Sequence, residues 1–228
     1  MDLLVSPSSA EEARYALSAD IIDVKKPSEG SLGANFPWVI SEIKNMSKKP
    51  VSAAIGDFGF LPGGASQAAF GAACAGADYI KVGLKFDGEE KAFDFIRDVT
   101  KAVKWRFPEK IVVAAAYADS GRVDSISPFD MAPIAAKAGA DVAMIDTAVK
   151  DGKGLFDFLN KEELAKFTEN NRKLGLKTAL AGSLKFNDLT VLKKINPEII
   201  GVRGMVCGGD RSAVIREELV QKAMAMVR

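Results

Sequence analysis

The residues best able to do chemistry are lysines and aspartates within or at the end of short apolar runs. Lys25 ends the run IIDVK, Lys81 lies within YIKVGL, and Asp146 lies within VAMIDT. A buried ammonium or carboxylate is costly unless it has a partner or a function. The chain contains no histidine, which excludes Ser-His-Asp and Cys-His nucleophile pairs and His-ligated metals. Lysine becomes the residue of interest, because burial can lower its pKa until it is a neutral amine.

A repeated Ala-Asp pair aligns three of these apolar runs with one another. The pair occupies positions 19–20, 77–78 and 140–141, directly before the runs. The third and fifth residues after each Asp are Asp23, Lys25, Lys81, Gly83, Met144 and Asp146. All six lie an odd number of positions after the Asp, and we say that they share one parity. Side chains alternate between faces along a strand, so we expect these residues to point to one side of a sheet. The residues between them are apolar and suit the opposite face, beneath helices.

The charged members of this set have a simpler and a functional interpretation. One isolated Lys-Asp pair would most simply be a structural ion pair. Two lysines and two aspartates of one parity on alternate strands favour a functional cluster near the mouth of the sheet. Lys26 has the opposite parity and is expected to be a solvated or loop lysine. Pro27 ends the strand, because proline has no N–H for the ladder.

The order of elements predicts the fold that would hold this cluster. Eight short apolar runs are expected strands, at 3–6, 21–25, 51–56, 79–84, 111–118, 142–147, 178–182 and 199–204. Helical spacing separates them, at 9–17, 37–46, 88–107, 160–175 and 211–227. Ser9 with Glu12, and Asn160 with Glu163, have the spacing of capping boxes. The alternation predicts an α/β fold, a single TIM barrel domain over residues 1–228: a (β/α)8 barrel of eight parallel strands with outer helices.

An open doubly wound sheet is the structural alternative, although the chain has no GxGxxG loop between a strand and a helix. In the barrel, the loops after the seventh and eighth strands commonly hold a phosphate, because glycine lets backbone N–H groups close on an anion. The phosphate candidates are Gly182, Ser183, Gly204, Gly208 and Gly209, with Arg203 or Arg211 as the charge partner. Such glycines also occur in ordinary turns. Lys150 is a third amine expected near the mouth, where a plain surface lysine is the simpler interpretation.

Composition limits the partners and the compartment. Thirty-one basic against 30 acidic residues give a net charge of +1, so we expect no nucleic acid and no membrane surface as partner. The chain has no apolar span of membrane length and no signal-like N-terminus, which predicts a soluble cytoplasmic protein. Two distant cysteines are expected to be free thiols. Apolar residues expected on outer helices, such as Trp38, Trp105 and Phe107, leave a homo-oligomer open.

Inward lysines, a phosphate site and the absence of histidine together suggest Schiff-base chemistry on a small carbonyl phosphate. An amine condenses with the carbonyl, and the iminium then serves as an electron sink for proton removal at the adjacent carbon. Asp23 and Asp146 would orient the amines or carry protons, and a second lysine would act as base. The pattern leaves open which lysine forms the imine. It also leaves open a noncatalytic barrel that binds a phosphorylated metabolite.

Several long segments of the chain are similar to one known family. LLVSP, ADIIDVK, EGSLGANFPW, GADYIKVGL, VVAAAYAD, DVAMIDTAVKDGK, LAGSLK and CGGDR resemble the (5-formylfuran-3-yl)methyl phosphate synthase family over essentially the whole chain. The resemblance implies a lyase of methanofuran biosynthesis that joins two glyceraldehyde 3-phosphates into (5-formylfuran-3-yl)methyl phosphate, with loss of one phosphate and two waters. It implies no metal or organic cofactor. Another Schiff-base aldolase acting on a triose phosphate is the alternative enzyme.

The same resemblance implies roles for individual residues. Lys25 matches the Schiff-base lysine, and Lys81 matches the proton acceptor. Asp146 and Lys150 match residues that assist proton transfer and handling of the second triose. Lys26 stands where the family often has Asn, so two adjacent lysines compete for the nucleophile's role, and strand parity favours Lys25.

Overall fold

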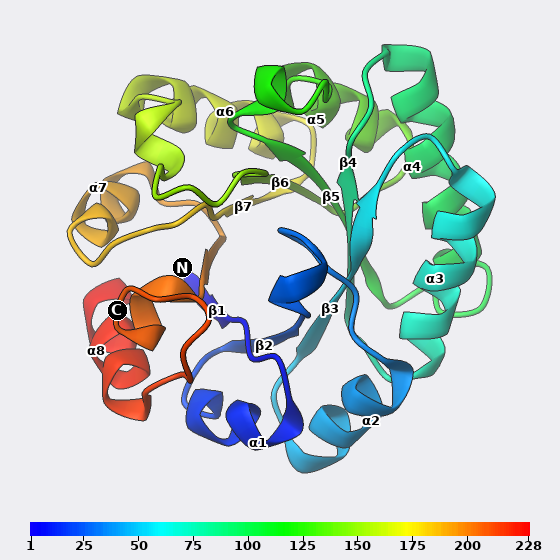
Figure 1. Cartoon of the computed structure of the whole chain (residues 1–228). Helices are drawn as coiled ribbons and strands as arrows, with labels where there is room; N and C mark the ends of the chain where they lie inside the picture. Colours follow the sequence, from blue (N-terminus) through cyan, green and yellow to red (C-terminus); the bar gives the residue numbers. More distant parts are fainter.

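The computed structural model describes residues 1–228 as one closed barrel of parallel strands (Figure 1). Each strand pairs with the next in the chain, and β8 pairs with β1 to close the sheet. The strands are β1 (Asp2–Val5), β2 (Ile21–Val24), β3 (Val51–Phe58), β4 (Tyr79–Leu84), β5 (Ile111–Tyr117), β6 (Val142–Asp146), β7 (Lys177–Leu180) and β8 (Ile199–Val202). The predicted (β/α)8 barrel is confirmed, and its strands lie within two or three residues of the expected runs.

Helices form an outer ring around the strands (Figure 1). They are α1 (Ala10–Ala13), α2 (Pro37–Met46), α3 (Pro62–Cys74), α4 (Glu89–Lys104), α5 (Pro128–Lys137), α6 (Lys161–Lys173), α7 (Asp188–Ile195) and α8 (Glu217–Val227). Short 3-10 turns add η1 (Arg14–Ala16), η2 (Pro27–Glu29), η3 (Ser120–Arg122), η4 (Leu155–Asp157) and η5 (Gly204–Cys207). None of the helices has the length and apolar character to cross a bilayer. Trp38 and Trp105 are 65% and 80% exposed on the outer ring, and a homo-oligomer stays a prediction.

Two local predictions at the helix ends were wrong. The last helix begins at Glu217 and not at Arg211, because tertiary partners hold the backbone before it: the Ile215 N–H donates to the Glu12 carboxylate. The capping box at Asn160 is complete. At Ser9 only half of it forms, since the Glu12 side chain turns instead to Ser8 and Arg203.

The strand faces follow the predicted parity. Ile22, Val24, Ile80, Val82, Ala143 and Ile145 all belong to the larger apolar core under the helices. A smaller apolar cluster fills the barrel interior and contains Ile21 and Met144, which have the opposite parity. The barrel is therefore packed from inside by one residue set and from outside by the other, as the Ala-Asp repeat indicated.

A repeated carboxylate contact fixes the bottom of the barrel. Before each even strand, an acidic residue accepts the N–H of the first or second residue of the preceding odd strand: Asp20 from Leu3, Asp78 from Val51, Asp141 from Val112 and Glu198 from Thr178. Each also pairs with a cation from a helix or helix end, namely Arg228, Lys44, Lys104 and Arg172. The Asp of each Ala-Asp pair therefore has a structural function. Glu198, which follows Pro197, has the same function before β8, although no Ala-Asp pair marks it in the sequence.

These contacts predict a stability cost that is separate from activity. Asp78→Ala leaves the N–H of Val51 buried without its acceptor and frees Lys44. We expect the free energy of unfolding, measured in urea, to fall by about 1–3 kcal/mol. The matched control is Asp94→Ala, which breaks an exposed pair with Arg97 and should cost less than about 0.5 kcal/mol. Equal, small effects for the two variants would contradict the assignment.

Candidate active site

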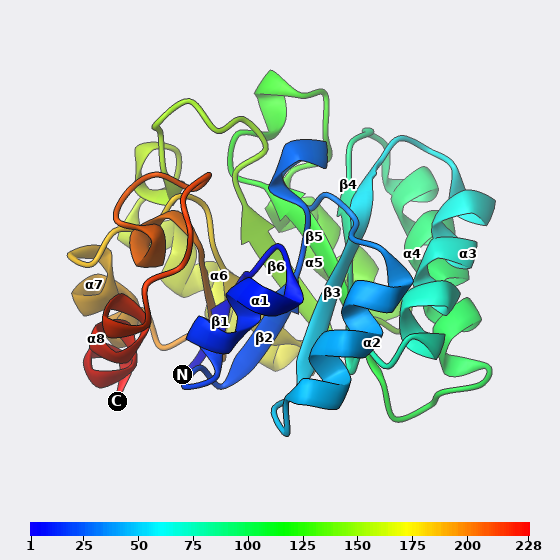
Figure 2. The ribbon, with the colours of Figure 1, turned by 60° about the horizontal axis from the view of Figure 1, so that its bottom comes forward.

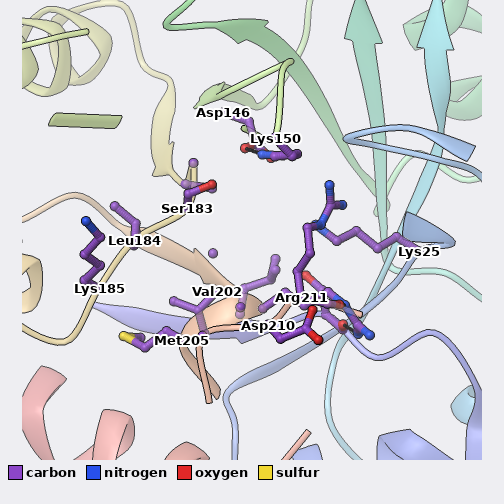
Figure 3. Close-up of a pocket in the computed structure, with 18 of the residues that line it drawn as sticks. Lys25, Asp146, Lys150, Ser183, Leu184, Lys185, Val202, Met205, Asp210 and Arg211 are labelled. Carbon is purple, nitrogen blue, oxygen red and sulfur yellow. Dashed lines mark hydrogen bonds and ion pairs between the residues drawn. The ribbon is translucent and has the colours of Figure 1, made fainter. Parts of the chain in front are cut away.

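A cavity of about 670 Å³ opens at the carboxyl ends of the strands. The loops after β2, β5, β6 and β8 all rise on this side of the barrel (Figure 2). Nearly all of the residues singled out from the sequence line the cavity: Lys25, Lys81, Asp146, Lys150, Gly182, Ser183, Arg203, Gly204, Gly208 and Gly209. Asp23 lies behind them, fully buried. Figure 3 shows Lys25 and Lys150 reaching into this space from different sides.

Lys25 follows the last residue of β2, and it is the buried cavity lysine without a partner. Its side chain is almost inaccessible, with 7% of the residue exposed, and its ammonium makes neither a hydrogen bond nor an ion pair with the protein. Burial lowers the pKa of Lys25 to about 8, a shift that Lys81 and Lys150 reinforce and that Asp146 and Asp23 only partly offset. About a tenth of such an amine is neutral at pH 7, against roughly one in several thousand for an ordinary lysine. This amine can therefore act as a nucleophile.

Lys26 lies outside the cavity, as its parity predicts. Its side chain is about one-third exposed and pairs with Glu29 at 2.6 Å. Its ammonium also lies 4.7 Å from the centre of the Phe36 ring. A solvated amine held between a carboxylate and an aromatic face has no route to a ligand in the barrel, so the two adjacent lysines have different environments.

Lys81 is held by Asp23 in a buried ion pair. The ammonium lies 2.8 Å from both carboxylate oxygens, and the hydroxyls of Ser6 and Ser52 donate to the same carboxylate at 2.8 and 2.7 Å. Burial would raise the pKa of Asp23, but the charges of Lys81 and Lys25 and these hydrogen bonds hold it below its usual range. Asp23 therefore stays a carboxylate and fixes the ammonium of Lys81 at the cavity wall.

Asp146 and Lys150 form a second pair at the mouth. The Lys150 ammonium donates to Asp146 at 2.7 Å and to the Thr147 hydroxyl at 2.9 Å. Burial would raise the pKa of Asp146, but Lys150, Lys25 and the backbone N–H of Thr147 lower it. Lys150 is thus no plain surface lysine. Asp119, which sequence reasoning missed, holds this turn by accepting the N–H groups of residues 148 and 149.

The β2–α2 loop covers part of the barrel centre, where η2 lies in Figure 1. Asp57 accepts the backbone N–H groups of Ser31 and Leu32 at 2.9 and 3.3 Å. The Ser31 hydroxyl donates to the carbonyl of Thr147 at 2.8 Å, which ties this loop to the β6 loop. Leu32 is fully buried and joins the interior apolar cluster. The loop therefore closes one side of the mouth.

Parity alone could not have found Asp57. The pairing of β3 with β4 shifts register between Ala54 and Asp57, and Gly56 between them has φ +130°. This bulge turns Asp57 inward although it lies an odd number of residues from Ala54. Tyr117 donates its hydroxyl to Asp57, and a side chain at Gly83 would collide with both groups. The GDFG sequence was the available signal, since glycine beside a strand aspartate is typical of a bulge.

The glycine loops offer backbone donors to the cavity. The N–H groups of Gly182, Ser183, Gly204 and Met205 donate to no protein acceptor. Gly182 and Ser183 both have positive φ, at 112° and 48°. A side chain at Gly182 would lie 3.1 Å from the backbone nitrogen of Thr147, so the loop is packed too closely for a larger residue. Such unpaired N–H groups are suited to an oxyanion.

Of the two arginines considered from the sequence as a charge partner for phosphate, Arg203 has other partners. The Arg203 guanidinium donates to Glu12 at 3.1 Å and to the carbonyls of Ser6 and Arg211 at 2.5 and 2.7 Å. Burial would raise the pKa of Glu12, but Arg203 and Ser8 lower it, so the carboxylate is charged. Arg203 thus fixes the β8–α8 loop from beneath, and a direct contact with phosphate stays a prediction. No protein atom accepts a hydrogen bond from the Arg211 side chain.

A parallel (β/α)8 barrel with lysines and free N–H groups at the carboxyl ends of its strands has the architecture of a TIM-barrel enzyme acting on a small ligand. Solved structures of low identity share this fold. A 3-hexulose-6-phosphate synthase has a TM-score of 0.70 at 20% identity, with all of both chains covered. KGPDC from Streptococcus mutans has a TM-score of 0.69 at 14% identity, covering 99% of this chain and 96% of that one.

Comparison with known sequences identifies the family of the chain, which the shared fold does not. The model of the 4-HFC-P synthase family matches residues 3–224. Proteins named (5-formylfuran-3-yl)methyl phosphate synthase are 58% identical in Methanosarcina barkeri, over 99% of this chain and 98% of that protein, and 52% identical in Archaeoglobus fulgidus, over 100% and 99%. The chain belongs to the (5-formylfuran-3-yl)methyl phosphate synthase family and is an enzyme.

Proposed function

We propose that this enzyme condenses two molecules of glyceraldehyde 3-phosphate, through an imine on Lys25, to (5-formylfuran-3-yl)methyl phosphate in methanofuran biosynthesis. The observation that carries the proposal is the unpaired, buried amine of Lys25 beside two lysines that already have carboxylate partners. Family membership supports the product. The overall reaction balances as two C3 phosphates giving one C6 phosphate, inorganic phosphate and two waters, with no net oxidation, and it fits a carbon–oxygen lyase.

The first half of the reaction uses Lys25 and Lys81. The neutral amine of Lys25 attacks the aldehyde carbon of one triose phosphate. The Lys81 ammonium donates a proton to the departing hydroxyl, which leaves as water and gives the iminium. Lys81 is then neutral and accepts the proton from the adjacent carbon, so that the electrons of the C–H bond enter the iminium and form an enamine. Asp23 holds Lys81 in place in both protonation states.

The second half uses Lys150 and Asp146. The enamine expels the phosphate from the third carbon of the bound triose, which leaves an enol at its second and third carbons. The enol carbon attacks the second carbon of the other triose, which a proton shift has made a ketone, and the Lys150 ammonium donates a proton to the oxygen that becomes negative. Asp146, at 2.7 Å from Lys150, orients this donor. Ring closure by a hydroxyl of the second triose and loss of two waters complete the furan, and hydrolysis of the imine releases the aldehyde and returns the Lys25 amine. The amine supplies the electron sink, so the scheme requires no metal or organic cofactor.

The glycine loops would bind a substrate phosphate. The free N–H groups of Gly182, Ser183 and Gly204 support this assignment, and Gly208 and Gly209 line the same wall with φ values of 77° and 101°. Arg203 would act through the loop that it fixes. A phosphate held there would orient the aldehyde carbon of a triose toward the lysines.

The imine predicts a covalent adduct at one residue. Sodium borohydride added with glyceraldehyde 3-phosphate should reduce the iminium to a stable secondary amine, which peptide mass mapping locates on Lys25. Lys25→Ala should lose the adduct and at least about a thousandfold of activity, because a covalent intermediate has no alternative nucleophile. An adduct on another residue, or activity kept by Lys25→Ala, would contradict the proposal.

The neighbouring lysine is the matched control. Lys26→Ala removes an amine of the same type one residue away and should keep the adduct, with activity within about threefold. Circular dichroism of both variants checks that the barrel is folded. A noncatalytic barrel would give no adduct in the unmodified enzyme.

The nature of the product distinguishes a furan synthase from another aldolase. Incubation with glyceraldehyde 3-phosphate alone should produce an ultraviolet absorbance typical of a conjugated furan aldehyde. It should also release one inorganic phosphate for every two trioses consumed. An acyclic sugar phosphate without released phosphate would replace this proposal by an aldol condensation on the same lysine.

A further inference from the structure

The Arg211 side chain, the second arginine considered from the sequence, lies in the cavity without a hydrogen-bond partner in the protein. It lines the cavity and is partly buried, yet none of its five N–H donors bonds to protein, and its Nη2 is fully buried without any acceptor. A buried donor without an acceptor is costly. It persists where a ligand supplies the acceptor.

The surroundings of Arg211 show why the protein does not satisfy it. Asp146 and Asp57 attract its charge, but neither lies within ion-pair distance, because each is engaged with Lys150 or with Tyr117 and the β2–α2 loop. Burial lowers the pKa of Arg211, a direction that indicates a poorly hydrated cation. A guanidinium in this state favours an anion with several oxygens.

The base of Arg211 is held in place. Its backbone carbonyl accepts from Arg203 at 2.7 Å, and Arg203 is fixed by the buried carboxylate of Glu12. The carboxylate of Glu12 also holds the N–H of Ile215 on the far side of the loop at 3.0 Å. The non-helical stretch before α8 therefore presents Arg211 from a braced loop, which limits the ordering entropy lost when a ligand binds.

We propose that Arg211 forms a second oxyanion subsite, which binds the phosphate of the triose joined to Lys25 and is separate from the donors of Gly182 and Ser183. In Figure 3, Arg211 and Lys25 reach into the cavity on one side, while Ser183 lies on the other. The inference rests on the proposed function, because a condensation of two triose phosphates brings two phosphates into one cavity. The glycine N–H groups account for one of them.

The test compares two aldehydes that differ only in the phosphate. Borohydride trapping is measured against concentration for glyceraldehyde 3-phosphate and for glyceraldehyde, in the unmodified enzyme and in Arg211→Gln. The variant should raise the half-saturating concentration of the phosphorylated aldehyde by about ten- to a hundredfold, the effect of losing a charge-assisted contact. Trapping of glyceraldehyde should be unchanged. Equal losses for both aldehydes, or no change for either, would overturn the subsite.

Arg216→Gln is the matched control. Arg216 comes from the same loop and lines the same cavity, but it is exposed and lies against Gly208. Its loss should change the half-saturating concentration less than about threefold.

A second measurement keeps the subsite testable if no imine forms. Glycerol 3-phosphate has the phosphate but no carbonyl, and it should raise the melting temperature of the unmodified enzyme more than glycerol does. Arg211→Gln should reduce this increase to the part that the glycine N–H groups supply, while Arg216→Gln keeps all of it. If no adduct forms but glycerol 3-phosphate still stabilises the enzyme in a way that depends on Arg211, the Schiff base is rejected and the subsite is kept. A temperature increase that Arg211→Gln leaves unchanged would reject the subsite.

Discussion

The chemistry of this barrel depends on an imbalance of charge inside it. Three lysines reach the carboxyl end of the barrel, and two carboxylates, Asp23 and Asp146, face them. Asp23 is bonded to Lys81 and Asp146 to Lys150, so the ammonium of Lys25 has only distant attraction to offset its desolvation. The neutral form becomes accessible at physiological pH for this reason. In the proposed mechanism, the same pairs hold Lys81 and Lys150 in place as proton donors beside Lys25.

The two ends of the barrel divide stability and chemistry between them. At the bottom, four acidic residues accept strand N–H groups, and each of the four also pairs with a cation from a helix or helix end. At the mouth, the glycine N–H groups, Lys25 and Arg211 have none. Unsatisfied groups weaken a fold, so a braced scaffold is required to hold them. Asp57, Asp119 and Glu12 supply that bracing at three of the loops on this side, those after β2, β6 and β8.

Much of this arrangement could be predicted from the sequence because strand parity is strict. The Ala-Asp repeat was enough to direct Asp23, Lys25, Lys81 and Asp146 inward and Lys26 outward. Parity failed at Asp57, where a bulge adds a residue. Helical spacing failed at the start of the last helix, where Glu12 accepts the backbone N–H of Ile215. Arginine roles could not be predicted either. Arg203 and Arg211 are eight residues apart, and only the position of Glu12 decides which guanidinium is already occupied.

The proposed imine requires Lys25 to be a buried amine with a lowered pKa. Enzyme labelled with ¹³C at the lysine ε carbon can be titrated by NMR from about pH 6 to about pH 11, and the Lys25 signal is identified by its loss in Lys25→Met. We predict a midpoint near 8 for this signal. A Lys25 signal that titrates near 10.4, the usual value for lysine, would contradict the account.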